Sequence, residues 1–241
     1  MIKIKKIIPT ALLLTSICST AFADNWNVGA SASYANIDGT ARDTQFTGNT
    51  SSGTPVAQTR GATGGDADFP FASIFVEYVK TMDKSFDLVL GLDYVPFKAE
   101  IDAKSFTDSN LSQELTGTSS TGQSGTRKAT LELKNYATLY IQPTYKIGGA
   151  TAVYGKVGYI HGDVKISGSN TATGSTINAT DTLNGYTVGL GLQHNINKNV
   201  FVRLEGNFTA HDDVTASDSL ATKYTADSEM YAGKISIGYS F

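Results

Sequence analysis

The end of the chain, residues 228–241, alternates between bulky apolar side chains and small or polar ones. The bulky set is Tyr231, Ile235, Ile237, Tyr239 and Phe241. Because successive side chains of a strand point to opposite faces, this stretch predicts a strand with one apolar face and one polar face. Most chain termini are polar and frayed, so an end with this pattern predicts a strand that is paired and held in place.

The same alternation recurs upstream, and the connections between the alternating stretches follow a pattern of their own. The predicted strands are residues 25–37, 70–81, 85–101, 130–147, 151–166, 183–196, 199–211 and 228–241. Three connections are tight, at 81–84, 148–149 and 197–199, and four are long, at 38–69, 102–129, 167–182 and 212–227. Long and short connections alternate, as in an antiparallel barrel with turns at one end and loops at the other. We therefore expect an all-β fold, a closed eight-stranded antiparallel up-and-down transmembrane β-barrel.

The N-terminus has the pattern of a secretory signal peptide. Three lysines lie within residues 3–6, an apolar stretch covers residues 7–17, and Ala21 and Ala23 form an Ala-x-Ala cleavage site. We expect residues 1–23 to be removed and residues 24–241 to form the barrel domain. The only cysteine, Cys18, lies in the segment that is removed, so the mature chain has no disulfide.

Charge and hydropathy narrow the choice of environment. Removal of the signal lysines changes the formal charge from −3 to −6, which disfavours a nucleic-acid partner. No apolar run approaches the roughly 18 residues of a membrane-spanning helix. Barrel strands need only about ten alternating residues each, so the weak overall hydropathy is compatible with a membrane barrel.

Three types of β-protein compete for this pattern: a secreted sandwich, a soluble lipocalin-type barrel and a membrane barrel. A water-facing barrel surface is normally a quarter to a third charged, whereas the polar face here is rich in Gly and Ser. Aromatic residues also recur in pairs eight positions apart on the apolar face: Trp26 and Tyr34, Phe86 and Tyr94, Tyr231 and Tyr239. On a tilted strand that spacing is about 20 Å of height, which matches two aromatic girdles flanking an apolar band. These features favour the membrane barrel.

The last strand, with apolar residues at alternate positions and Phe241 at its end, resembles the closing strand of bacterial outer-membrane barrels. The whole architecture is similar to the small eight-stranded family that includes the OmpX, Ail-like and opacity-type surface proteins and the barrel half of OmpA, without the peptidoglycan-binding domain of the last. The resemblance implies a bacterial outer-membrane location with extracellular loops. It also implies contact with outer-membrane lipid and lipopolysaccharide. Assembly by the barrel-assembly machinery would use the C-terminal residues Tyr231, Ile235, Ile237, Tyr239 and Phe241 as its signal. A host or surface ligand of the loops would be a further partner, and we expect a monomer.

The polar face of the predicted strands carries most of the ionisable residues of the barrel. They are Glu77, Asp87, Asp93, Glu132, Lys134, Lys156, Arg203, Glu205 and Lys234. An eight-stranded barrel is just wide enough for side chains to fill, and buried charges must pair. We therefore predict an ion-pair network that plugs the lumen, with Arg203 and Glu205 at its centre.

The family resemblance and this network favour a surface or envelope-structural role over two alternatives. An OmpW-type conduit for small hydrophobic molecules would need an apolar trough that opens sideways. A lipid A-modifying enzyme would need a histidine beside a nucleophile and an orienting acid, and nothing in the sequence joins His161, His194 or His211 to such a trio. We therefore predict no enzymatic activity, no cofactor and no metal site.

Overall fold

A computed structural model describes residues 25–47, 56–59, 63–101, 105–108, 125–170, 176–217 and 223–241. The predicted signal peptide, with Ala21 and Ala23, lies outside the described residues. The strands are β1 (Asn25–Thr47), β2 (Val56–Thr59), β3 (Thr63–Thr81), β4 (Phe86–Val95), β5 (Ala99–Ile101), β6 (Ser105–Asp108), β7 (Gly125–Gly148), β8 (Thr151–Asn170), β9 (Thr176–Asn195), β10 (Val200–Ser217) and β11 (Lys223–Ser240). Among these residues no helix is long and apolar enough to cross a membrane.

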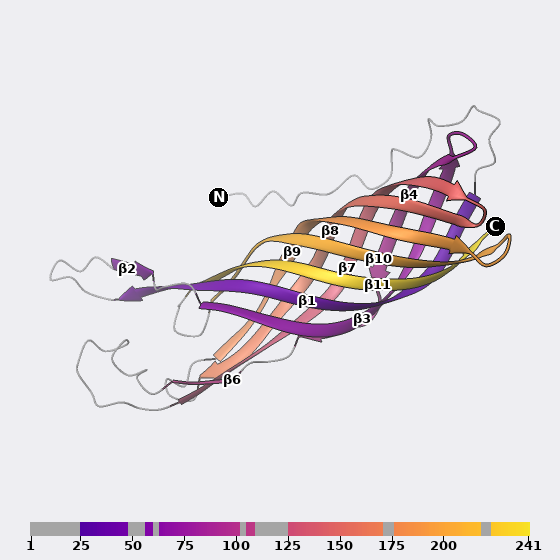
Figure 1. Ribbon diagram of the computed structural model, residues 1–241. Coiled ribbons are helices and arrows are strands. Elements are labelled where there is room, and N and C mark those ends of the chain that lie inside the picture. Colours follow the sequence, from indigo (N-terminus) through magenta and orange to yellow (C-terminus); the bar gives the residue numbers. More distant parts are fainter. Residues whose placement is uncertain are drawn as a thin grey trace.

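Eight strands form a closed antiparallel ring in the order β1, β3, β4, β7, β8, β9, β10 and β11. Figure 1 shows the barrel that they form. The ring closes where β11 pairs with β1, from Asn27 opposite Ser240 to Thr44 opposite Lys223. Phe241 and Trp26 then exchange two backbone hydrogen bonds of 3.0 Å at the end of this ladder. The predicted eight-stranded barrel is confirmed, and the short strands β2, β5 and β6 only extend its wall.

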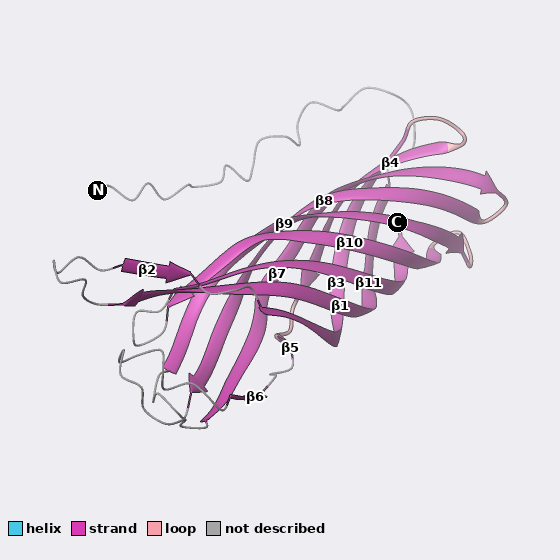
Figure 2. Cartoon of the chain, turned by 60° about the vertical axis from the view of Figure 1, so that its left-hand side comes forward, coloured by secondary structure: helices cyan, strands magenta, loops and turns pink. Residues whose placement is uncertain are grey.

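The strands run further than the alternation predicts, all at the end that carries the long connections. Each of the four stretches assigned to long loops contains residues of a strand; β1, for example, continues to Thr47 and β3 begins at Thr63. Figure 2 shows these extensions as long arms at the end opposite the C-terminus. Ladder hydrogen bonds join backbone groups, so they continue where the side chains no longer alternate. The predicted strands are therefore too short at this end of the barrel.

The apolar face points outward, as predicted. Leu190 is 75% exposed and Ile235 is 64% exposed, whereas Arg203 and Glu205 are only 5% and 4% exposed. Exposed aromatic rings gather at two levels, with Trp26 against Tyr78 near the C-terminal end of the barrel. At the other level, here called the outer aromatic level, the contacting pairs are Tyr159–Tyr186 and Phe208–Tyr231. The residues between these two levels are here called the membrane-spanning segments.

A bulge in β7 overturns part of the predicted interior. The register with β8 shifts between Lys134 and Ala137, and Asn135 adopts a φ of 50°. Such an extra residue reverses the faces of the strand beyond it. Leu133, which simple alternation places outside, is only 5% exposed and lies in the interior. Glu132 and Lys134 flank it on the strand, so their prediction as interior residues is wrong.

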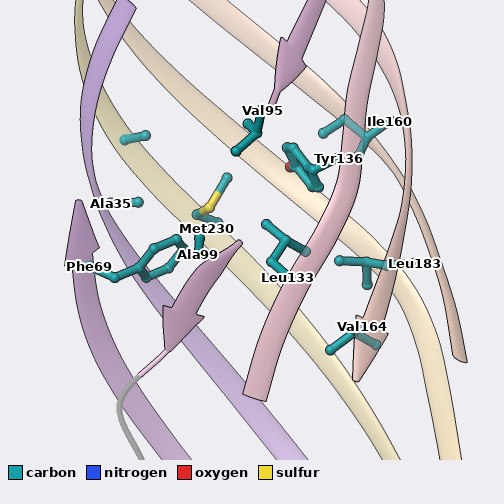
Figure 3. Close-up of a cluster of buried hydrophobic side chains, with 11 residues drawn as sticks. Ala35, Phe69, Val95, Ala99, Leu133, Tyr136, Ile160, Val164, Leu183 and Met230 are labelled. Carbon is teal, nitrogen blue, oxygen red and sulfur yellow. The ribbon is translucent and has the colours of Figure 1, made fainter. Parts of the chain in front are cut away.

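The interior has two layers. Near the C-terminal end it contains charged and aromatic side chains, described below. Toward the long-loop end it is filled by the apolar cluster of Figure 3: Ala35, Phe69, Val95, Ala99, Leu133, Tyr136, Ile160, Val164, Leu183, Met230 and Ala232. The cluster begins at the level of Tyr159 and Tyr231 and gives this end of the barrel a core of its own, which stabilises it by burial of apolar surface.

The wall around this apolar cluster is incompletely paired. The ladder between β3 and β4 begins at Ile74 opposite Tyr94 and runs toward the tight turn. Beyond it, the described residues of β3 from Thr63 to Ser73 pair with β1 alone, and β5 pairs with β7. Within the described chain, β3 and β5 are therefore neighbours without a ladder between them.

Candidate functional site

The centre of the interior is an ion pair between Glu77 of β3 and Arg203 of β10. Arg203 Nη1 and Nη2 donate to Glu77 Oε1 and Oε2 at 2.5 and 2.8 Å, a bidentate geometry. Glu77 also accepts hydrogen bonds from Asn27 Nδ2 at 2.9 Å and from the Tyr140 hydroxyl at 2.6 Å. Glu77 is 1% exposed, so these four donors replace the hydration that the carboxylate loses.

The Arg203 guanidinium has further partners. Its Nε donates to Gln193 Oε1 at 2.8 Å. Its Cζ lies 4.6 Å from the centre of the Phe201 ring and 5.5 Å from the Phe75 ring. Aromatic faces attract a cation, and more strongly when water is excluded. Hydrogen bonds and rings together hold the guanidinium across the lumen.

A second buried pair joins Glu205 of β10 to Lys156 of β8. Lys156 Nζ lies 2.8 Å from Oε1 and 2.6 Å from Oε2 of Glu205, and the Tyr154 hydroxyl donates to Oε2 at 2.8 Å. The ammonium also lies 4.4 Å from the centre of the Tyr140 ring. Arg203 and Glu205, which we expected to form the centre together, therefore pair with different partners on other strands.

Two more ion pairs join predicted interior residues. Lys234 Nζ lies 2.9 Å from Asp93 Oδ2, with both side chains largely buried. Asp87 pairs with Lys146 at 2.9 Å, where Lys146 is 43% exposed, so this pair lies toward the water-filled rim. Seven predicted residues thus have interior places: Glu77, Asp87, Asp93, Lys156, Arg203, Glu205 and Lys234.

The aromatic residues that surround these pairs were not predicted from the sequence. Each faces a glycine directly across a ladder, and the four pairs are Phe75–Gly29, Tyr140–Gly91, Tyr154–Gly191 and Phe201–Gly238. A Cβ added at any of these glycines would lie 2.2–2.3 Å from the ring of its partner. The rings therefore lie over bare backbone, which fits large side chains into a narrow barrel. The inward parity of the four aromatic residues is the signal that could have found them.

Glu132 and Lys134 form an ion pair of 3.0 Å outside the barrel interior, and Lys98 approaches the same carboxylate at 3.9 Å. They lie beyond the outer aromatic level, outside the membrane-spanning segments. The hydrogen bond from Lys134 lowers the pKa of the Glu132 carboxyl. The pair stabilises the bulged wall at the surface, where such pairs contribute little.

Of the three histidines, His211 has a hydroxyl partner on each side. Its Nδ1 lies 3.1 Å from Ser228 Oγ and its Nε2 lies 3.3 Å from the Tyr136 hydroxyl. A nucleophilic serine would need its base to be oriented by a further group, usually a carboxylate, and a phenol holds that place here. His161 and His194 contact Asn184 and Thr151 respectively.

Comparison with known proteins identifies relatives by family and by fold. A family model described as "Outer membrane protein beta-barrel domain" matches residues 10–241. Among solved structures, the outer membrane protein OprG from Pseudomonas aeruginosa is similar with a TM-score of 0.53 and 15% identity, over 91% of this chain and 96% of that one. Ail, the attachment invasion locus protein of Yersinia pestis, aligns over 89% of this chain and 98% of its own, with 14% identity and a TM-score of 0.41. A search of curated proteins finds no match.

Proposed function

The chain belongs to the outer membrane protein β-barrel family and lies in the bacterial outer membrane, and from this premise we propose that it forms no axial pore and acts through its external face. The observation that carries the proposal is the bidentate Arg203–Glu77 pair, which spans the lumen among closely packed rings. The function is therefore contact with a surface, a host molecule or lipopolysaccharide, or support of the envelope.

The filled interior supports this reading. In the membrane-spanning segments three cations, Arg203, Lys156 and Lys234, meet three carboxylates. Beyond them the apolar cluster fills the section of the barrel that continues past the outer aromatic level. In a conducting channel, charged side chains would instead line an open, water-filled pore. The extended strands then act as a rigid platform for the external connections.

Single-channel recording tests the absence of a pore. The folded wild-type protein in planar bilayers is expected to give no large, steady openings, because ion pairs and rings occupy the cross-section. The paired variant Arg203→Ala/Glu77→Ala removes the central plug and is expected to raise conductance, while Lys98→Ala outside the barrel serves as the control. Large, steady openings of the wild type would disprove the sealed lumen.

Exchange of the external segments tests where the protein acts. Residues 109–124 and 171–175 would be replaced by short Gly-Ser connections in separate variants expressed on the surface of a bacterium that lacks this protein. Adhesion to host cells and to lipopolysaccharide-coated beads is expected to fall in at least one variant, with heat-modifiable migration on a gel as the control for folding. Unchanged adhesion in all variants, with normal envelope integrity, would contradict an external role.

The C-terminal strand supports two further parts of the proposal. We propose that β11 is the strand by which the barrel-assembly machinery recognises the chain, since its apolar row ends at Phe241 and its other edge closes the ring on β1. We also propose a monomer, because the closed ring leaves no long free edge in the membrane-spanning segments.

A conduit for small hydrophobic molecules is a second candidate. The unpaired stretch between β3 and β5 lies beside the apolar cluster, at the level where lipid meets water. Phe69 and Ala99 face the interior on either side of that stretch. A disulfide between Phe69→Cys and Ala99→Cys should lower uptake of a small hydrocarbon into proteoliposomes, and reduction should restore it. Equal uptake by the oxidised and reduced forms would remove this candidate.

A further inference from the structure

A small cavity of about 40 Å³ lies inside the barrel where the charged layer meets the apolar cluster. On one side it is lined by polar groups, among them Thr187, Thr209 and the Lys156–Glu205 pair. Figure 3 shows the apolar cluster from which the opposite wall comes, with Tyr136, Ile160 and Met230 labelled. The cavity therefore has one polar wall and one apolar wall.

The polar wall is balanced in charge. Lys156 pairs with Glu205 and Lys234 pairs with Asp93, and all four side chains line the cavity. An additional ion between these paired side chains would have no counter-charge of its own, and an unpaired buried charge is expensive. The Thr209 hydroxyl donates to Thr187 Oγ1 at 3.0 Å, and the Thr187 hydroxyl donates to Phe208 O at 3.1 Å, so both hydroxyl protons are in use. Thr209 Oγ1 can still accept a hydrogen bond from an uncharged hydroxyl group.

We propose that this cavity binds a small amphiphile with one uncharged hydroxyl group. The hydroxyl donates to Thr209 Oγ1, and the apolar part replaces packing contacts of Met230 and Ile160. This interior site goes beyond the external role proposed above and is independent of it.

The cavity is too small for a whole amphiphile, so part of its apolar wall must move when the molecule binds. A space of about 40 Å³ accommodates one or two water-sized groups, which is enough for the polar end of such a molecule. The apolar part of the molecule fits only if a side chain moves. Met230 is suited to this movement because it is unbranched and flexible. The unpaired wall between β3 and β5 offers the neighbouring route of entry.

A series of four probes separates the chemistry of the polar group from that of the apolar part. We would titrate the full-chain protein in lipid nanodiscs with 4-methylphenol, toluene, 4-methylbenzoate and 4-methylbenzylamine. The ¹³C-methyl shifts of Met230 and Ile160 report binding as a function of the free aqueous concentration of probe. The phenol is expected to bind about fivefold more tightly than toluene, the value of one net hydrogen bond. Both charged probes are expected to bind at least about tenfold more weakly than the phenol.

Two variants and one control assign the site. Thr209→Val removes a cavity hydroxyl and should reduce the preference for the phenol over toluene, leaving toluene binding unchanged. Ala232→Leu fills the cavity and should abolish the shifts with all probes, whereas Ala30→Leu on the outer face should leave them unchanged. Equal binding of all four probes, a preference for a charged one, or a cavity that holds water only would overturn the proposal.

Discussion

Replacement of Gly91 by alanine tests whether the rings over glycine hold the central ion pair in place. A Cβ at position 91 would lie 2.3 Å from Tyr140 Cζ and 2.5 Å from its hydroxyl. All three nearest atoms belong to the Tyr140 side chain, so the ring must move rather than the backbone. Movement of about 1 Å to reach ordinary contact would break the 2.6 Å hydrogen bond from Tyr140 to Glu77.

The expected cost of Gly91→Ala follows from these contacts. A hydrogen bond to a charged group contributes about 1.5–3 kcal/mol, and a side chain forced from its rotamer costs about 0.5–1.5 kcal/mol more. We therefore expect the free energy of unfolding to fall by about 2–4 kcal/mol. Urea unfolding in lipid vesicles, followed by the fluorescence of the single tryptophan, Trp26, measures this quantity.

Two further variants make the test specific. Gly206→Ala is the matched control, because nothing lies within 4 Å of a Cβ at that outward-facing glycine, and its stability should change by less than about 0.5 kcal/mol. The double variant Gly91→Ala/Tyr140→Ala should be no less stable than Tyr140→Ala alone, since the clash has been removed. Wild-type stability of Gly91→Ala, or simple additivity in the double variant, would refute the reasoning.

Three other changes address the pair, the lipid face and the closing strand. Arg203→Met should cost about 3–5 kcal/mol, because Glu77 stays buried without its counter-charge, and addition of Glu77→Leu should recover most of the loss in the same urea assay; a single variant as stable as the wild type would contradict this. Leu190→Lys places an ammonium on the exposed apolar face and should cost about 2–4 kcal/mol in lipid vesicles, with no loss expected if that face met water. Deletion of Phe241 removes the two backbone bonds to Trp26 and should reduce the heat-modifiable folded fraction on a gel severalfold, whereas undiminished assembly would argue against its closing role.

The residues of the site could be predicted from the sequence, but the ion pairs that they form could not. Parity along each strand indicated that Glu77, Arg203, Glu205 and Lys156 share the interior. It could not indicate that Arg203 reaches Glu77, 126 positions away in the chain, in preference to Glu205. That choice depends on the stagger of the closed ring, which sets the residues that meet across the lumen.

Local irregularity also escaped the sequence. Asn135 tolerates positive φ, but one asparagine within a strand does not by itself predict the bulge that turns Leu133 inward and Glu132 outward. The inward aromatic residues share the parity of the charged ones, but parity does not show whether a ring fits: Tyr140 fits only because the register places Gly91 directly opposite it. Both features arise from contacts between strands, which a pattern within one strand does not contain.

The number of strands in the ring, the outward apolar face and the order of short and long connections could all be predicted from the amino-acid sequence. These follow from two local rules: side chains alternate along a strand, and lipid solvates only apolar groups. The ion-pair partners, the rings over glycine, the bulge and the apolar layer in the interior became visible only in the folded barrel. Those features depend on which residues the closure of the ring brings together across the barrel.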